Sequence, residues 1–146
     1  MPLKNKTEYG ASFKADFYEK YAFFASRTKT FSKRAFEHIT ARNWNASIFS
    51  SKTALADNFY YRLKNDEISN PEFENVIAIC IGLRLTKWER NELFELAGYT
   101  FKNTLLHFAY LHILDECNIR NIDDFNTAFM ALEIEGHKSP PLKSYR

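Results

Sequence analysis

Apolar residues recur every three or four positions along most of this chain, and no stretch alternates convincingly between apolar and polar residues as a half-buried strand does. The spacing therefore predicts an all-α protein without a sheet. The expected helices cover about residues 13–26, 32–42, 46–53, 57–64, 71–83, 86–97, 103–117 and 123–132.

The first of these helices has aromatic residues on one face. Phe13, Phe17, Tyr21 and Phe24 are spaced so that they form a single stripe along a helix. A stripe of this kind needs a surface to cover it. We expect it to pack on the domain that follows, and an exposed stripe that binds a partner is the alternative.

Capping residues indicate where the second helix begins. Ser32 is the expected N-cap, because its hydroxyl can accept a backbone N–H bond. Phe31 and Phe36 lie on either side of this cap at the spacing of a hydrophobic staple. The residues expected to face inward from this helix are Phe36, Ile39 and Thr40.

The helices after residue 70 also have start and stop signals. Asn70 followed by Pro71 predicts a helix start, since proline is favoured at the first helical position. Thr86 and Glu89 form a capping box, and Gly98 is expected to end that helix in the left-handed conformation. The residues expected to face inward from helix 71–83 are Phe73, Val76, Ile77 and Cys80.

The last helix is expected to begin at Asp123, which can act as its N-cap. Its inward residues should be Phe125, Ala128, Phe129 and Leu132. Residues 136–146 are rich in polar residues and prolines, and we expect a mobile tail there.

Residues 46–65 have a more specific pattern, which is a short helix, a tight turn and a second short helix. Asn45 can cap the first helix, and Leu55 can fill the turn. The residues expected to face inward are Phe49 and Thr53 on the first helix, and Tyr60 and Leu63 on the second. Two helices joined in this way form a helix-turn-helix, whose second helix can lie in the major groove of DNA.

The residues in and around this motif resemble the lambda-repressor-like, Cro-type helix-turn-helix family, also called the xenobiotic-response-element family of bacterial regulators. The segment Tyr61-Arg62-Leu63-Lys64-Asn65 is similar to the end of that family's recognition helix. Residues 70–83 resemble its loop and fourth helix, and residues 86–99 resemble its fifth helix. The C-terminal pair of helices resembles an extension found in a bacterial subgroup.

The resemblance covers about residues 31–99 and implies a division of the chain. Residues 1–30 would form an N-terminal helical extension, and residues 31–99 a five-helix DNA-binding domain. Residues 100–135 would form the C-terminal helical pair, and residues 136–146 the tail.

The resemblance also implies which residues contact DNA. The base-reading positions of the family fall on Asp57, Asn58, Tyr61 and Arg62, and its phosphate-contacting positions fall near Ala46, Lys64 and Asn65. Arg62 can pair with guanine and Asn58 with adenine through two hydrogen bonds each. Asn45 can donate to a phosphate, as can Lys64, Asn65 and the first backbone N–H groups of helix 46–53.

Four positions depart from the family's pattern. Ala54 replaces the turn glycine, and Ala46 stands where a phosphate-binding glutamine is common. Ala56 replaces the usual serine or threonine cap, so Asp57 is expected to cap one residue later. In addition, Asp57 would repel DNA phosphates unless it caps the helix or accepts a bond from cytosine.

Charge is unevenly distributed, although the net charge of the 146 residues is only +2. Residues 1–41 and 42–64 have net charges of +4 and +3, whereas residues 65–100 and 101–146 have −4 and −1. Positive charge on the motif is typical of a DNA-facing surface, and ordinary scatter of surface charge is the alternative.

Other chemistry finds little support in the sequence. No glycine-rich phosphate loop or HExxH motif occurs, and His107 and His112 are five residues apart rather than the four that place two ligands on one helix face. We therefore expect no metal site, no cofactor and no enzymatic activity. Cys80 and Cys117 are expected to be reduced, buried thiols. The apolar runs are too short to span a membrane, so a cytoplasmic protein with no membrane partner is expected.

Together these features predict a sequence-specific double-stranded DNA-binding protein, a bacterial or phage transcription regulator that reads the major groove with helix 57–64. The apolar residues of the N-terminal helix and of the C-terminal pair could form a homodimer interface or an intramolecular core. The alternative is a protein-interaction or inhibitor module built on the same scaffold, with a protein partner and no specific DNA binding. A regulator that senses a small molecule would need a pocket.

Overall fold

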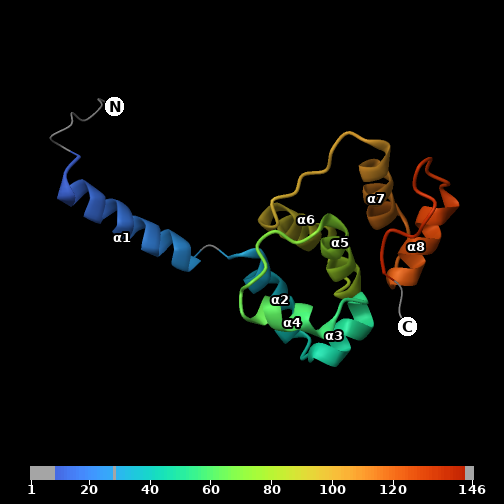
Figure 1. Ribbon diagram of the computed structural model, residues 1–146, viewed down its shortest axis with the longest axis horizontal. Coiled ribbons are helices and arrows are strands. Elements are labelled where there is room, and N and C mark those ends of the chain that lie inside the picture. Colours follow the sequence, from blue (N-terminus) through green and yellow to red (C-terminus); the bar gives the residue numbers. More distant parts are fainter. Residues whose placement is uncertain (1–8, 28, 144–146) are drawn as a thin grey trace.

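The computed structural model describes residues 9–27 and 29–143, and within these ranges it is all-helical, with eight helices and no strand (Figure 1). This confirms the all-α prediction. The helices are α1 (Ala11–Arg27), α2 (Phe31–Ala41), α3 (Ala46–Thr53), α4 (Asp57–Lys64), α5 (Phe73–Gly82), α6 (Lys87–Leu96), α7 (Leu105–Glu116) and α8 (Ile122–Ala131). The predicted bounds of α3 and α4 are confirmed to the residue.

Helices α2 to α6 pack around a common core. The central element is α5, which is buried on almost every side because apolar residues surround its axis. The largest fully buried side chains contributed by the other four helices include Phe31, Ile39, Phe49, Leu63 and Leu93. The inward residues predicted for α5, namely Phe73, Val76, Ile77 and Cys80, are all buried.

The C-terminal pair α7 and α8 is joined to this core by aromatic rings. Phe73 of α5 stacks on His107 of α7 with ring centroids 4.7 Å apart, and it also contacts the ring of Tyr110 at 5.9 Å. Tyr110 in turn contacts Phe125 and Phe129 of α8. Because His107 also accepts a hydrogen bond from the backbone N–H of Lys102 at 2.8 Å, its role is structural.

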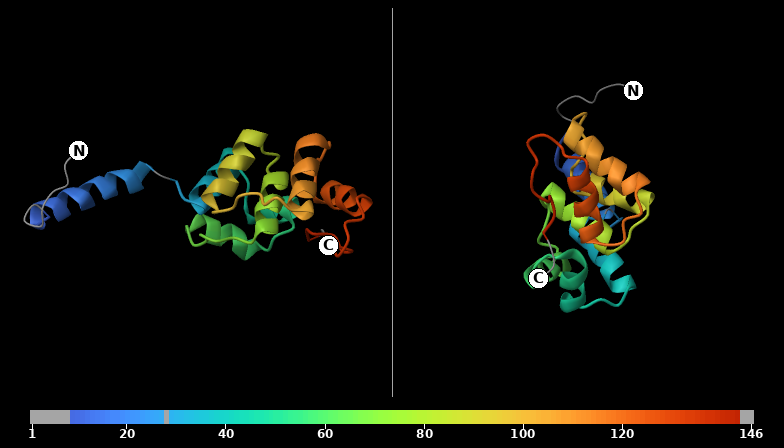
Figure 2. Two further views of the ribbon diagram at one scale, coloured as in Figure 1. Left: turned by 90° about the horizontal axis from the view of Figure 1, so that it is seen from above. Right: turned by 90° about the vertical axis from the view of Figure 1, so that its right-hand side faces the viewer.

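Helix α1 extends away from the other helices, as two views show (Figures 1 and 2). Phe13 is 45% exposed, and Phe17 and Tyr21 are each 56% exposed. The side chain of Phe24, the fourth member of the predicted stripe, lies outside the described residues. The expectation that the stripe packs on the following domain is therefore wrong for Phe13, Phe17 and Tyr21, whose rings lie on the surface.

The start of α2 differs from the prediction. Thr30, not Ser32, is the N-cap, since its side chain accepts from the backbone N–H of Lys33. Ser32 is buried, where its hydroxyl donates to the carbonyl of Ile68 and accepts from the N–H of the same residue. Phe31 therefore begins the helix rather than preceding a cap, and Thr40 is exposed instead of inward.

Two further helix starts are also displaced. Helix α5 begins at Phe73, and Pro71 precedes it as a buried residue whose carbonyl accepts from the hydroxyl of Tyr99 at 2.6 Å. Asn121 rather than Asp123 caps α8, because its side chain accepts from the N–H of Asp124.

Other local predictions are confirmed. Asn45 caps α3 by accepting from the N–H of Ile48 at 2.8 Å. Thr86 and Glu89 form the complete capping box of α6. Gly98 has a φ of +83°, the left-handed conformation expected after the end of α6.

Two expectations about the C-terminal part are wrong. Leu132 is 45% exposed rather than inward, and Cys117 is exposed, whereas Cys80 is buried as expected. Burial raises the pKa of the Cys80 thiol to about 12.

The tail is held at Leu142, whose backbone N–H and carbonyl both bond to the side chain of Asn126. This anchoring argues against mobility at that residue, and residues 144–146 of the predicted tail lie outside the described residues.

Candidate nucleic-acid interface

Helices α3 and α4 are joined by a turn of three residues, 54–56. Ala54 adopts the left-handed conformation with φ +61° and ψ 16°, which lets the chain reverse direction after α3. Leu55 is buried beneath the turn, as predicted. The hydroxyl of Thr53 accepts from the N–H of Leu55 at 3.2 Å, so the turn is held by a local bond as well as by packing.

The N-cap of α4 is Ala56, which makes no side-chain capping bond. Asp57 does not take over this role as expected. Its carboxylate instead accepts from the hydroxyl of Ser50 at 2.5 Å, a bond that links α4 back to α3. An acidic residue in the first turn is also favourable beside the positive end of the helix dipole.

One face of α4 is fixed against the core. Leu63 is buried, and Phe59 and Tyr60 are half-buried against the same core. The ring of Tyr60 contacts Phe36 of α2 at 5.4 Å and Phe49 of α3 at 6.0 Å between centroids. These contacts confirm that Tyr60 and Leu63 face inward, and they fix the rotation of α4 about its axis.

The opposite face of α4 is exposed and holds the four predicted base-reading residues. Asp57, Asn58, Tyr61 and Arg62 are all exposed, and Tyr61 is 52% exposed although it is aromatic. Positions separated by one, four and five residues lie on one side of a helix, so these side chains share a face. The structure therefore brings the predicted set together on one surface.

The predicted phosphate contacts lie around this face. Lys64 and Asn65 are exposed at the end of α4, and Asn45 is exposed at the start of α3. Ala46 is buried, so any contact at that position falls to its backbone N–H rather than its side chain. The oxygen of the Asn45 amide is used by the α3 cap, which leaves its NH₂ group as the donor.

Lysines from α2 and the segment before it add positive charge next to α4. Lys64 shares the lining of a shallow cavity of about 210 Å³ with Lys29 and Lys33. Lys29 pairs with Glu37 at 3.3 Å, and Lys33 lies 3.8 Å from Asp66. Because these pairs are exposed, they contribute little to stability, and the ammonium groups remain accessible to an anion.

Basic residues outside the predicted set were missed by the sequence. Arg42, Arg84 and Arg120 line a cleft that also includes Lys52. They come from the end of α2, from the residues after α5 and from the residues before α8. The positive net charge of residues 42–64 is a sequence signal for Arg42 and Lys52. Nothing in the local sequence links these two residues to Arg84 or Arg120.

No group of His, Cys, Asp and Glu side chains among the described residues could hold a metal ion. None of the helices in residues 9–27 and 29–143 is long and apolar enough to cross a membrane. No protein-family model matches the chain, no curated protein matches it significantly, and no solved structure does so either.

Proposed function

We propose that the chain is a sequence-specific double-stranded DNA-binding protein, a cytoplasmic transcription regulator of bacterial or phage type. In this proposal α2 to α6 form a lambda-repressor-like helix-turn-helix domain, and α4 is its recognition helix. The observation that carries the proposal is the exposed face of α4, where Asn58, Tyr61 and Arg62 point away from a core that holds the opposite face.

Each residue of this face has a role that its chemistry allows. The guanidinium of Arg62 can donate two hydrogen bonds to O6 and N7 of guanine. The amide of Asn58 can pair with N6 and N7 of adenine. Tyr61 stands at the remaining base-reading position, where its side chain faces the groove. The Lys64 ammonium can donate to a phosphate that flanks the groove, which fixes the position of α4 without reading sequence.

The bond between Ser50 and Asp57 reduces the objection to an acidic residue at this surface. The Asp57 carboxylate accepts from Ser50, so one of its oxygens is held toward α3. The other oxygen remains available to accept from N4 of cytosine. Asp57 then contributes to specificity by disfavouring bases that present an acceptor.

A selection from a random pool of DNA duplexes tests the proposal. The wild-type chain should enrich one motif, and Arg62→Ala should weaken binding to it by about 1–3 kcal/mol while relaxing preference at one base pair. Asn58→Ala should relax a different base pair. Lys138→Ala removes an exposed charge beyond α8 and is the matched control. Enrichment of no motif by the wild type would overturn the proposal.

Salt dependence gives a second measurement. Each phosphate neutralised by a basic residue releases counterions, so the logarithm of the affinity should fall linearly with the logarithm of salt concentration. Lys64→Ala should reduce this slope by about one and weaken all duplexes alike. A slope that does not change would remove Lys64 from the phosphate contacts.

A homodimer accords with this proposal, since paired recognition helices read two half-sites. The exposed rings of α1, including Phe17 and Tyr21, are one surface available for it. In the C-terminal pair, Phe108 is exposed, Leu111 and Leu114 are half-buried, and Tyr110, Phe125 and Phe129 are buried within the chain itself. A sedimentation experiment should show a dimer at micromolar concentration that Phe17→Ser/Tyr21→Ser converts to a monomer.

The same exposed helix supports the second candidate, a protein-interaction module. The exposed rings of α1 could bind a different protein. In addition, Ala46, Ala56 and Asp57 each replace a residue type that contacts DNA or caps the recognition helix in the family that the chain resembles. Retention on a duplex column at low salt distinguishes the two candidates. A chain that passes through without retention favours the interaction module.

A further inference from the structure

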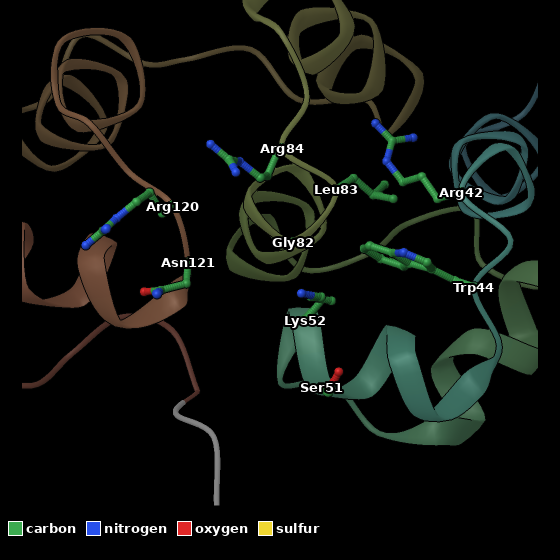
Figure 3. Close-up of a pocket in the computed structure, with 9 residues that line it drawn as sticks. All are labelled: Arg42, Trp44, Ser51, Lys52, Gly82, Leu83, Arg84, Arg120 and Asn121. Carbon is green, nitrogen blue, oxygen red and sulfur yellow. The ribbon is translucent and has the colours of Figure 1, made fainter.

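A cleft of about 480 Å³ lies where α3, the end of α2, the end of α5 and the start of α8 approach one another (Figure 3). Four of the residues that line it are basic and none is acidic. Its volume is in the range of small-molecule sites, about 300–1,000 Å³. The lining consists of Arg42, Trp44, Ser51, Lys52, Gly82, Leu83, Arg84, Arg120 and Asn121.

The fold, rather than the sequence order, brings the basic residues together. In Figure 3, Lys52 and Arg84 lie toward the middle of the cleft, Arg42 and Trp44 lie on one side, and Arg120 lies on the other. Gly82 makes this possible, because a Cβ there would lie 2.8 Å from Cγ2 of Thr53 and 2.9 Å from the carbonyl oxygen of Lys52. The absence of a side chain lets α3 approach the end of α5.

Intramolecular pairing neutralises this cleft only in part. Nε of Arg120 lies 3.3 Å from a carboxylate oxygen of Asp124, an exposed pair that an anion can displace. Nη1 of Arg42 donates to the carbonyl of His38 at 2.8 Å, which orients the guanidinium but leaves its charge. In the described part of the chain, Arg84 has no carboxylate within ion-pair distance.

Gathering like charges in one cleft costs electrostatic energy, and an anion would remove that cost. Arginine pairs best with oxygens that accept two parallel hydrogen bonds, as phosphate oxygens do. The indole ring of Trp44 adds a flat aromatic surface at one side of the cleft, and a nucleobase can stack on such a ring. Lys52 and Arg84 in the middle of the cleft and Arg120 at one side can hold phosphates, and Trp44 at the other side, next to Arg42, can receive a base.

We propose that this cleft binds a nucleoside triphosphate, with the phosphates held by Lys52, Arg84 and Arg120 and the base placed against Trp44. The site does not depend on DNA binding by α4. Because Ser51 and Lys52 belong to α3, which packs on α4, a ligand here would contact the helix that supports the exposed face.

Tryptophan fluorescence of the full chain tests the proposal directly. Only two tryptophans are present, and Trp88 is 80% exposed on α6, so Trp88→Phe leaves Trp44 as the sole reporter. ATP and GTP should change the emission of Trp44 with micromolar dissociation constants. Inorganic triphosphate should compete with them, and adenosine alone should bind at least tenfold more weakly.

Two variants locate the site. Arg84→Gln and Arg120→Gln each remove one charge at an exposed position, and each should weaken ATP binding about tenfold. Circular dichroism and the melting temperature confirm that both variants fold. Lys138→Ala, an exposed lysine outside the cleft, should leave the affinity unchanged. Failure of ATP and GTP to bind at millimolar concentration, or wild-type affinity in both arginine variants, would overturn the proposal.

The phosphates of DNA are the other source of the same chemistry, and a final arm separates the two. A duplex of random sequence is titrated into the wild type and into Arg84→Gln/Arg120→Gln. If these substitutions weaken duplex binding while no nucleotide binds, the cleft contacts the DNA backbone and the nucleotide proposal is wrong. If nucleotides bind and the duplex affinity is unchanged, the cleft is a separate nucleotide site.

Discussion

Ala54 occupies a backbone conformation that disfavours every residue with a Cβ. Its φ of +61° lies in the left-handed region, where an L-residue other than glycine costs about 1–2 kcal/mol. Glycine avoids that cost but loses about 0.5–1 kcal/mol through its greater freedom in the unfolded chain. We expect Ala54→Gly to raise the free energy of unfolding by about 0.5–1 kcal/mol in urea titrations.

Ala41→Gly is the matched control for this substitution. Ala41 is the last residue of α2 and is exposed, so glycine there gains no relief of strain. Its free energy of unfolding should fall by about 0.5–1 kcal/mol. Equal effects of the two substitutions would show that Ala54 is not strained. If Ala54→Gly leaves the duplex affinity unchanged, the missing turn glycine is a matter of stability alone.

His38 makes the stability of the fold depend on pH. It is buried, and within residues 9–27 and 29–143 its Nε2 has no hydrogen-bond partner. Burial lowers the pKa of His38, and the nearby charges of Arg34 and Arg42 lower it further, whereas Glu89 and Glu92 oppose them. Because the pKa is lower in the folded state, the unfolded chain binds a proton more readily. Protonation therefore favours unfolding.

We expect the contribution of His38 to be complete above pH about 6.5, the ordinary histidine value, and to decline as the pH falls toward its folded pKa. Urea titrations between pH 5 and 7.5 measure this slope. His38→Leu should flatten it, since the variant has no group to protonate at that position. His107, whose pKa is also lowered by burial, titrates in both chains and cancels in the comparison. An identical slope in wild type and variant would refute the assignment.

At the scale of single elements, the helices most accurately predicted are those whose ends are set by local bonds. Asn45 and the pair Thr86 and Glu89 cap helices through backbone groups three residues away, and sequence spacing is enough to find them. Serine at position 32 is equally suited to capping a helix. Its hydroxyl bonds instead to Ile68, thirty-six residues further along, which spacing alone does not reveal.

The difference between local and long-range contacts also separates the exposed face of α4 from the basic cleft. The exposed face of α4 was predictable because Tyr60 and Leu63 identify the buried side of one short helix. The basic cleft was not, since Arg84 and Arg120 come from separate loops that only the tertiary fold brings together. For α1 the periodicity gave the helix correctly. Periodicity does not say what covers an apolar stripe, and the packing prediction was wrong for that reason.

The contact between α3 and α5 depends on one glycine. A methyl group on Gly82 would meet Thr53 and the backbone of Lys52 at distances under 3.0 Å, and the backbone cannot yield without moving α3. We expect Gly82→Ala to lower the free energy of unfolding by about 1–3 kcal/mol, although alanine has the higher helix propensity. Chemical denaturation measures this change in the free energy of unfolding.

Gly10→Ala provides the comparison, since nothing lies within 4 Å of the Cβ it would add. This variant should unfold like the wild type. A Gly82→Ala chain of unchanged or increased stability would mean that α3 shifts at little cost. In that event the close approach of α3 to α5 would contribute little to the free energy of unfolding, and it would hold Lys52 only loosely in the cleft.

At the scale of the whole molecule, α7 and α8 are part of the same folded unit as α2 to α6. Phe73 and Tyr110 connect the aromatic rings of the two parts, and Leu142 is buried beyond α8. Pro141 and Leu142 also line a cavity with Leu55 and Ala78, so the end of the described chain returns to the turn and to α5. A single cooperative unfolding transition follows from this arrangement.

Asn126 holds that returning segment in place. It is 6% exposed, its Nδ2 donates to the carbonyl of Leu142 at 2.9 Å, and its Oδ1 accepts from the N–H of Leu142 at 3.1 Å. Removing the amide leaves two buried backbone groups without partners, at a cost of about 1–3 kcal/mol each when water cannot replace them. Asn126→Ala should therefore lower the melting temperature and expose residues 139–143 to proteolysis.

Asn118→Ala, at an exposed position before α8, is the matched substitution and should change neither property. Trypsin cleavage after Lys143 and Lys138, followed by mass spectrometry, reports on the segment, while calorimetry reports on the whole chain. If Asn126→Ala accelerates cleavage without lowering the melting temperature, the segment is held locally and contributes nothing to the core. If the cleavage rate and the melting temperature change together, the bonds to Leu142 stabilise the contact of the C-terminal helices with α5. That contact then depends on the returning segment as well as on the rings of Phe73 and Tyr110, so α2 to α8 unfold as one unit.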